Sequence, residues 1–396
     1  MRSLRPALLF VGTLLTALGY GATFVLTEHF RALGGTEVNT GLTLAGAMVG
    51  TFLGVPLVGL FAERLGAARM AALGAFLLAL GYQSLASLAE VNLWTLLAGL
   101  LIGLGWGTFY LAAPLALSAR VTDADRAFWF ARFGAFQMAG IGLSPSVATA
   151  LIEQLHLSTA TVLSAIACAC LLASAHLAVF EYVSKRPTPA STMINTGWLR
   201  ALPHLMRTRA RFPIMMVGLG ACVFSGLMTF QSSLVRGTTL HAGTYFLVYA
   251  VTVVGSRLAL ASFLARVQAD RLAVVLLVLM VMGVLVANFM ASGLAVQVGS
   301  AVLLGLGYGL AYSVIQAQVI NDAPPELRHA ALTWFVLAYF VGIFGFPMLG
   351  GWIIVHLGTG LCLTVVLGLA LSELGLALLR NGDLARKFRH DSAANV

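Results

Sequence analysis

The chain has 396 residues, of which 60% are apolar and only 9% carry a charge. Soluble globular domains contain about 45–50% apolar and about 25% charged residues, so this composition excludes a water-soluble fold. It also excludes a disordered chain, because disordered segments are poor in apolar residues. The formal net charge of +9 comes from too few charges for a nucleic-acid-binding surface. We therefore expect a membrane protein that binds no nucleic acid.

Twelve apolar runs follow one another along the chain, separated by charges, prolines and glycine-rich turns. A helix needs about 20 residues to cross the hydrocarbon core, and it satisfies its own backbone hydrogen bonds there. The first run is longer than a signal-peptide core and is followed by many similar runs, so we interpret it as a retained span. The predicted transmembrane helices are 6–30, 39–61, 67–88, 93–118, 127–152, 157–181, 212–235, 243–265, 272–292, 294–319, 329–355 and 357–379.

Basic residues gather on one side of these spans. If the chain starts in the cytoplasm, every lysine and arginine except Arg31, Arg236 and Arg257 falls in or beside a cytoplasmic segment. Such an asymmetry indicates orientation in helical membrane proteins. We predict a multi-pass protein of a bacterial-type cytoplasmic (inner) membrane with both termini in the cytoplasm. Its positive charge then contacts anionic membrane lipid.

A long polar segment divides the chain near its middle. The predicted domains are an N-terminal six-helix bundle over 1–184, a cytoplasmic linker over 185–211, and a C-terminal six-helix bundle with a cytoplasmic tail over 212–396. Within the linker, apolar residues recur at helical spacing from Trp198 to Met206 among several arginines. This pattern predicts a short amphipathic helix on the membrane face, and a disordered linker is the alternative.

The second half of the chain repeats the first at an offset of 202 residues. The segment from Gly103 to Pro145 then aligns without a gap to the segment from Gly305 to Pro347. The same offset pairs Tyr110 with Tyr312. We interpret the chain as two bundles related by duplication, with the same orientation. In transporters built from such parallel repeats, the substrate site lies between the repeats near the membrane midplane.

The turn after the second span reads Gly-Leu-Phe-Ala-Glu-Arg-Leu-Gly-Ala-Ala-Arg. It resembles the G-x-x-x-D-R-x-G-[RK]-[RK]-[RK] loop of the major facilitator superfamily, and the resemblance extends over essentially the whole chain. It implies an all-α polytopic membrane protein with twelve transmembrane helices in two pseudo-symmetric six-helix bundles. It also implies a conformational latch, whose residues here are Gly59, Glu63, Arg64, Gly66 and Arg69. Glu63 replaces the usual aspartate, and Ala265 stands at the acid's position in the second half.

Glycines and prolines in the fifth and eleventh spans resemble a motif of export-type members of this superfamily. Small residues allow close helix contact, and proline introduces a kink. Together with Gly255-Ser-Arg257 in the eighth span, the pattern most resembles the drug and metabolite (sugar-efflux-like) exporters. The expected hinge and packing residues are Gly140, Pro145, Gly342, Pro347, Gly350 and Gly351.

Two arginines lie inside spans that face each other in the superfamily's fold, namely Arg132 in the fifth and Arg257 in the eighth. A charge in the hydrocarbon costs at least about 2.5 kcal/mol on insertion scales, so such residues are functional candidates. If both reach the cavity, they favour an anionic or zwitterionic solute. The alternative is that each extends to the interface or bonds to helix carbonyls.

Uncharged polar residues complete the candidate substrate site, and packing between helices is their alternative role. These candidates are Tyr20, Tyr110, Gln137, Gln231, Tyr249, Tyr312, Gln316 and Tyr339. Glu28, at the outer end of the first span, is the candidate for proton coupling, with an ordinary interfacial ion pair as the alternative. Glu373 in the last span is expected either to be structural or to extend toward Arg380.

The sequence contains no Walker loop, no metal-ligand cluster and no nucleophile motif, so we expect no enzyme, no metal and no cofactor. We predict a monomeric secondary active transporter that moves a small organic solute by alternating access. The solute is an anionic or zwitterionic metabolite, a siderophore or a drug, and the expected process is proton-coupled efflux. The alternatives are an uptake permease for an organic anion and a non-transporting sensor or scaffold that kept the fold.

Overall fold

The computed structural model describes residues 4–122, 125–184, 198–264 and 267–394. Within these ranges the regular secondary structure is entirely helical, as the sequence predicts. Eleven helical segments of the described chain are long and apolar enough to cross a membrane. The remaining expected span, 243–265, corresponds to the helix Ala242–Leu264. The prediction of a polytopic all-α protein is therefore confirmed.

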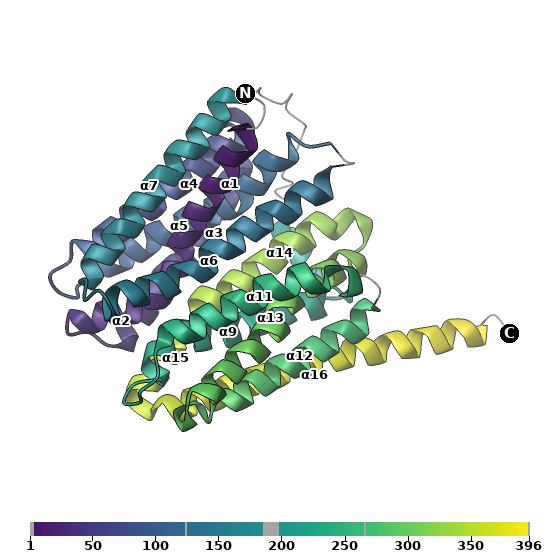
Figure 1. Cartoon of the computed structure of the whole chain (residues 1–396). Coiled ribbons are helices and arrows are strands. Elements are labelled where there is room, and N and C mark those ends of the chain that lie inside the picture. The colour runs from purple at the N-terminus through teal and green to yellow at the C-terminus, as the bar shows by residue number, and fades with distance from the viewer. Residues whose placement is uncertain (1–3, 123–124, 185–197, 265–266, 395–396) are drawn as a thin grey trace.

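The first six spans form one bundle (Figure 1). Its first span is divided into two α-helices by the short 3-10 helix Ala22–Val25. The helices of this bundle are α1 (Leu4–Gly21), α2 (Leu26–Ala32), α3 (Glu37–Leu65), α4 (Ala67–Ala86), α5 (Trp94–Ser118), α6 (Arg126–Glu153) and α7 (Thr159–Val183).

The last six spans form the second bundle (Figure 1). Its helices are α9 (Arg211–Thr229), α10 (Gln231–Leu234), α11 (Ala242–Leu264), α12 (Ala269–Ala287), α13 (Leu294–Asp322), α14 (Arg328–Phe340), α15 (Phe346–Leu357) and α16 (Thr359–Ala394). The N-terminus and the end of α16 lie on the same side of the molecule, which we call the termini face (Figure 1). The other end of the bundles is the opposite face.

Two rows of glycines let α3 and α5 pack backbone to backbone. Gly46, Gly50 and Gly54 recur every four residues on α3, as do Gly99, Gly103 and Gly107 on α5. A Cβ atom added at Gly103 would overlap the carbonyl group of Ala47, so no other residue fits there without a shift. In lipid, where helix association depends on van der Waals packing, this close approach stabilises the bundle.

Proline shapes the eleventh span, which is interrupted by a single π-helical turn over Val341–Gly345. Pro347 has no backbone N–H and leaves the carbonyl of Ile343, four residues earlier, without its helical partner. The hydroxyl of Ser225 on α9 donates to this carbonyl at 2.7 Å. The freed backbone group is thus satisfied by a side chain of the neighbouring helix.

The fifth span contains the matching proline but remains one continuous helix. Pro145 frees the carbonyl of Ile141 in the same way. Gly21 of α1 packs directly onto that carbonyl, because an added Cβ would overlap its oxygen. Each expected hinge proline therefore frees a carbonyl that the first span of the same bundle contacts. These contacts come from α1 at Ile141 and from α9 at Ile343.

The predicted duplication is visible in contacts between the bundles. A two-fold axis relates the two repeats, and a residue close to this axis lies next to its counterpart in the other repeat. Hydrogen bonds between residues 202 apart in sequence therefore show where the axis runs. The pairs are Thr27 with Thr229, Arg31 with Ser233, and Tyr110 with Tyr312. The structure thus confirms two pseudo-symmetric bundles in one register.

A short helix, α8 (Trp198–Leu205), lies in the second half of the predicted linker. Ala201 and Leu205 are buried, and Leu199 and Arg200 are exposed, so the helix is amphipathic as expected. It docks on α14, where the indole N–H of Trp334 donates to the carbonyl of Trp198 at 2.9 Å. The first part of the linker, 185–197, lies outside the described residues.

Candidate substrate site

The two bundles meet at the opposite face and part toward the termini face. Gly142 of α6 packs closely against Ala250 of α11. Nearer the termini face, a Cβ added at Gly134 of α6 or Gly255 of α11 would meet no atom within 4 Å. All hydrogen bonds between the bundles in the described chain lie at the tyrosines described next or closer to the opposite face. Within the described chain, the space between the bundles is therefore less closely packed toward the termini face.

A group of tyrosines closes this space near the middle of the bundles. We call it the tyrosine cluster, and it consists of Tyr20, Tyr110, Tyr249, Tyr308, Tyr312 and Tyr339. The hydroxyls of Tyr110 and Tyr312 lie 2.7 Å apart, and those of Tyr20 and Tyr339 lie 3.3 Å apart. Tyr110, Tyr312 and Tyr339 are partly exposed, whereas the other three are buried. The exposed three therefore line the side that faces this less closely packed space.

Arg257 of α11 lies beside the tyrosine cluster. Its Nε and Nη2 donate to the carbonyl of Gly309 at 3.3 and 2.8 Å, across to α13. Its guanidinium lies within electrostatic reach of Tyr110, Tyr249, Tyr308 and Tyr312. No ion pair joins Arg257 to a carboxylate within the described chain. A half-buried positive charge therefore stands next to aromatic rings with only a neutral carbonyl as its partner.

The structure brings five predicted tyrosines together in the tyrosine cluster. Tyr110, Tyr249 and Tyr312 neighbour Arg257 directly, and Tyr20 and Tyr339 join them through contacts with the other rings. Gln316 is half-buried and follows Tyr312 by one turn on α13, toward the termini face. Gln137 is buried on α6.

Two other candidates lie apart from this group. Arg132 is exposed, and its guanidinium lies 4.3 Å from the centroid of the Phe128 ring, nearer the termini face. Gln231 is fully buried near the opposite face, where its amide contacts the sulfur of Met290 at 3.1 Å. Hydropathy identified these residues as polar within apolar runs, but it carries no information on the helix face.

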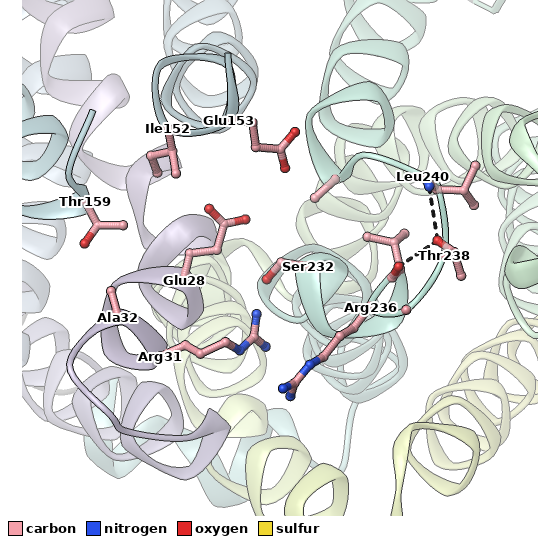
Figure 2. A pocket seen from close by; sticks show the side chains of 13 residues that line it. Glu28, Arg31, Ala32, Ile152, Glu153, Thr159, Ser232, Arg236, Thr238 and Leu240 are labelled. Carbon is pink, nitrogen blue, oxygen red and sulfur yellow. Dashed lines mark hydrogen bonds between the residues drawn. The ribbon is translucent and has the colours of Figure 1, made fainter. Parts of the chain in front are cut away.

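Glu28 lines a separate cavity of about 510 Å³ at the opposite face, between α2, α6 and the segment around α10. Figure 2 shows Glu28 and Glu153 pointing into the same space, while Arg31 and Arg236 approach it from another wall, below Ser232. Glu153 also contacts Nδ1 of His241 at 2.6 Å, which ties α6 to the start of the second bundle's α11. The cavity, which residues of both bundles line, thus places Glu28 among charges of both signs.

Next to this cavity, three polar side chains connect the bundles. Nη2 of Arg31 donates to Glu37 at 2.8 Å and to Ser233 at 3.1 Å. The Ser233 hydroxyl donates in turn to the same Glu37 oxygen at 2.7 Å. Arg31 and Glu37 belong to the first bundle and Ser233 to the second. We call these three residues the opposite-face bridge.

Each bundle carries an ion pair at the termini face. Arg120, at the end of α5, pairs with Glu181 of α7. In the second bundle the signs are exchanged, because Arg380 of α16 pairs with Asp322, at the end of α13, and with Asp270. The expected contact of Glu373 with Arg380 is therefore wrong. Glu373 is instead 1% exposed, and its carboxyl group packs on Gly220 of α9.

The expected latch loop is described in part. Gly66 ends α3 with a φ of +95°, a backbone conformation that favours glycine, and it lies directly against Glu181. Arg64 and Arg69 are exposed on either side of this turn. The side chain of Glu63 lies outside the described residues.

The chain matches the model of the Major Facilitator Superfamily over residues 9–347. It belongs to this superfamily. No curated protein matches the chain by sequence. Among solved structures, the superfamily fold is shared with the nucleoside transporter NupG, with 16% identity, a TM-score of 0.77, and coverage of 95% of this chain and 99% of that chain. The POT family transporter PepTSo is 12% identical, with a TM-score of 0.74 and 98% coverage of both chains.

Membership of the superfamily establishes this protein as a multi-pass membrane transporter of a small molecule, and not as an enzyme. The likeness to NupG and PepTSo concerns the fold alone, because the identities are low. In this fold two bundles enclose the substrate between them, near the midplane. The tyrosine cluster connects the two bundles, and Arg257 lies beside it.

Sequence analysis did not identify Glu37, Ser233, Tyr308 or Trp106 as parts of these sites. One available signal was the repeat itself, because Ser233 is the counterpart of Arg31 at the offset of 202 residues. Tyr308 stacks on Phe224 with ring centroids 4.7 Å apart, and Trp106 stacks on Tyr20 at 4.5 Å. Both lie one turn before a predicted tyrosine, Tyr312 or Tyr110, on the same helix face.

Proposed function

We propose that this transporter moves a small organic anion or zwitterion out of the cell by alternating access, in exchange for protons. The observation that carries the proposal is Arg257. A guanidinium that faces the space between two transporter bundles, without a carboxylate partner in the described chain, attracts a negative group of a solute.

The proposed orientation places the termini face in the cytoplasm of a bacterial-type inner membrane, because basic residues concentrate at that face. The space below the tyrosine cluster then opens to the cytoplasm, where an exporter loads its solute. The proposed moving bodies are the bundles 1–184 and 212–396, connected by the linker 185–211, within a monomer. The latch loop around Gly66 and the prolines Pro145 and Pro347 are proposed to act in the transition between states.

Glu28 is proposed to carry the coupled proton. It is half-buried in the cavity at the opposite face, and no hydrogen bond to its carboxylate is recorded in the described chain. A carboxylate at this position, beside Glu153 and close to the opposite-face bridge, takes up a proton from the outside when the cavity opens. Proton binding there then favours the return of the unloaded carrier.

A deletion strain tests direction and solute class together. An exporter predicts that one or more organic anions accumulate inside the deletion strain, and that expression of the wild-type chain restores their release. An uptake permease predicts the reverse, namely depletion inside the cell and accumulation in the medium. Normal metabolite levels and normal drug sensitivity, with the protein present in the membrane of the parent strain, would contradict both.

Proteoliposomes test the coupling. An imposed proton gradient is expected to accelerate movement of the accumulated anion, and collapse of the gradient with a protonophore is expected to remove that acceleration. An unchanged rate after collapse would exclude proton antiport while leaving transport itself intact.

A further inference from the structure

The chemistry around Arg257 narrows the class of solute. This inference rests on the proposed function, because it takes the surroundings of Arg257 to be the substrate site. We propose that the ligand is a planar organic anion, whose flat body inserts between Tyr110 and Tyr339 and whose negative group binds the free end of the Arg257 guanidinium.

The free end of Arg257 follows from its hydrogen bonds. Nε and Nη2 each donate one N–H to the Gly309 carbonyl, so this carbonyl occupies one edge of the planar guanidinium. The two N–H groups of Nη1 and the second N–H of Nη2 are left for another acceptor. They form the edge of the guanidinium that binds a carboxylate with two parallel hydrogen bonds. The arginine is therefore held in place by the protein and still has one complete edge for an anion.

Tyr110, a neighbour of Arg257, stacks on an aromatic ring of the other bundle. Tyr110 belongs to α5 and Tyr339 to α14, and their ring centroids lie 6.3 Å apart with 19° between the planes. Contacting carbon atoms lie about 3.5–4.0 Å apart, so a flat guest between two parallel rings needs roughly 7–8 Å. The two rings now stack on each other, so a flat guest replaces this contact and moves the rings apart. One ring belongs to each bundle, so a ligand in this position contacts both bundles.

The groups behind these rings also favour an acceptor on the ligand. Trp106 packs on Tyr110 with centroids 5.8 Å apart, and its indole N–H is buried without a hydrogen-bond partner. The hydroxyl of Tyr308, which neighbours Tyr312 and Arg257, is also buried without a partner. Buried donors of this kind are costly unless something accepts from them. A ligand with several acceptor oxygens satisfies them.

The same surroundings discriminate against cations and zwitterions. The carboxylates of the described spans lie elsewhere: Glu28, Glu37 and Glu153 at the opposite face, Glu181, Asp270, Asp322 and Glu326 at the termini face, and Glu373 against α9. An ammonium group in the tyrosine cluster would thus stand beside a guanidinium with no opposite charge. The aromatic rings attract a cation only weakly, and the fixed positive charge of Arg257 repels it more strongly.

The test uses five probes of one size on the purified full-length protein: 2-naphthoate, its saturated analogue decahydro-2-naphthoate, the neutral 2-naphthamide, the cation 2-naphthylmethylammonium, and the zwitterion 2-naphthylalanine. Binding is measured by the ligand-induced shift of the melting temperature and by competition titration. We expect 2-naphthoate to bind at least about tenfold more tightly than each other probe, since each stacked aromatic face adds to affinity and the charge adds more.

Matched variants assign the two contributions. Arg257→Gln is expected to make 2-naphthoate and 2-naphthamide bind equally, with stacking retained. Tyr339→Leu is expected to make 2-naphthoate and its saturated analogue bind equally, whereas Tyr339→Phe keeps the preference. Unchanged melting temperature and a monodisperse elution profile without ligand show that each variant is folded. A variant that fails this control is replaced by Arg257→Met or Tyr110→Leu.

Tighter binding of the cation or the zwitterion, equal binding of the planar and saturated acids by the wild type, or binding of none of the five probes would each overturn the inference. Transport of a cation or zwitterion by the same protein in liposomes would overturn it and leave the transporter intact. Absence of any substrate movement in cells and liposomes would instead overturn the proposed function.

Discussion

The opposite-face bridge offers the sharpest test of how the two bundles move. Ser233→Ala removes a hydroxyl that donates to Glu37 at 2.7 Å and accepts from Arg31 at 3.1 Å. The ion pair between Arg31 and Glu37 stays intact, because both residues belong to the first bundle. The substitution therefore weakens only the link between bundles. Ser232→Ala is the matched control, since the neighbouring hydroxyl has no hydrogen-bond partner.

The magnitude follows from the exposure of the bridge. A hydrogen bond to a charged group contributes about 1.5–3 kcal/mol. The side chain of Arg31 is 32% exposed, so water replaces part of the hydrogen bonding that Ser233→Ala removes. We therefore take the lower end of that range for the two hydrogen bonds of the Ser233 hydroxyl together. A loss of about 1.5 kcal/mol shifts the equilibrium toward the state open at the opposite face by about tenfold.

Electron–electron distance measurements between two spin labels report this equilibrium. Leu93 and Phe289 are exposed on loops of the first and second bundle at the opposite face, and serve as labelling sites once the four native cysteines are replaced by serine. Ser233→Ala is expected to increase the population with the longer distance about tenfold, and Ser232→Ala to leave it unchanged. An equal distribution in the two variants would refute the view that the bridge holds this face closed.

Two further substitutions test other parts of the account. Glu28→Gln is expected to abolish the response of transport to a proton gradient, while solute exchange without a gradient persists. The control Glu90→Gln, on an exposed loop of the same face, is expected to leave the response intact. A normal response in Glu28→Gln would exclude this carboxylate from the coupling mechanism. Gly103→Ala places a Cβ on the carbonyl of Ala47 and is expected to cost about 1–3 kcal/mol, seen as a lower melting temperature in detergent. The control Gly299→Ala adds a methyl group where nothing lies within 4 Å, so an equal loss in both variants would show that this close packing is not what stabilises the first bundle.

Hydropathy and the internal repeat were sufficient to predict the architecture. Each apolar run became a helix because lipid leaves the backbone no other partner, and the offset of 202 residues predicted which residues lie near the axis between the bundles. Tyr110 and Tyr312 illustrate this, since the offset pairs them and the structure joins their hydroxyls. The direct contact between them follows from helix rotation, which the offset alone does not define.

The parts that sequence could not predict depend on which helix face meets which neighbour. Glu373 and Arg380 lie two turns apart on one helix, which suggested a contact, but Arg380 binds two aspartates on other helices. Arg132 and Arg257 look equivalent as charges in apolar runs, yet only Arg257 lies beside the tyrosine cluster. The opposite-face bridge was missed because Arg31, Glu37 and Ser233 lie at the ends of three different helices, and helical periodicity does not show which helix ends meet.

The central claim is that the solute binds at Arg257 between the two bundles. Counterflow in proteoliposomes, using the anion that accumulates in the deletion strain, tests it most directly. The wild type and Arg271→Gln, which removes an exposed charge at the termini face, are expected to exchange the anion at similar rates. Arg257→Gln is expected to reduce exchange by about 100-fold or more, because a buried ionic partner of the solute is lost. Equal exchange by Arg257→Gln and Arg271→Gln would contradict the account.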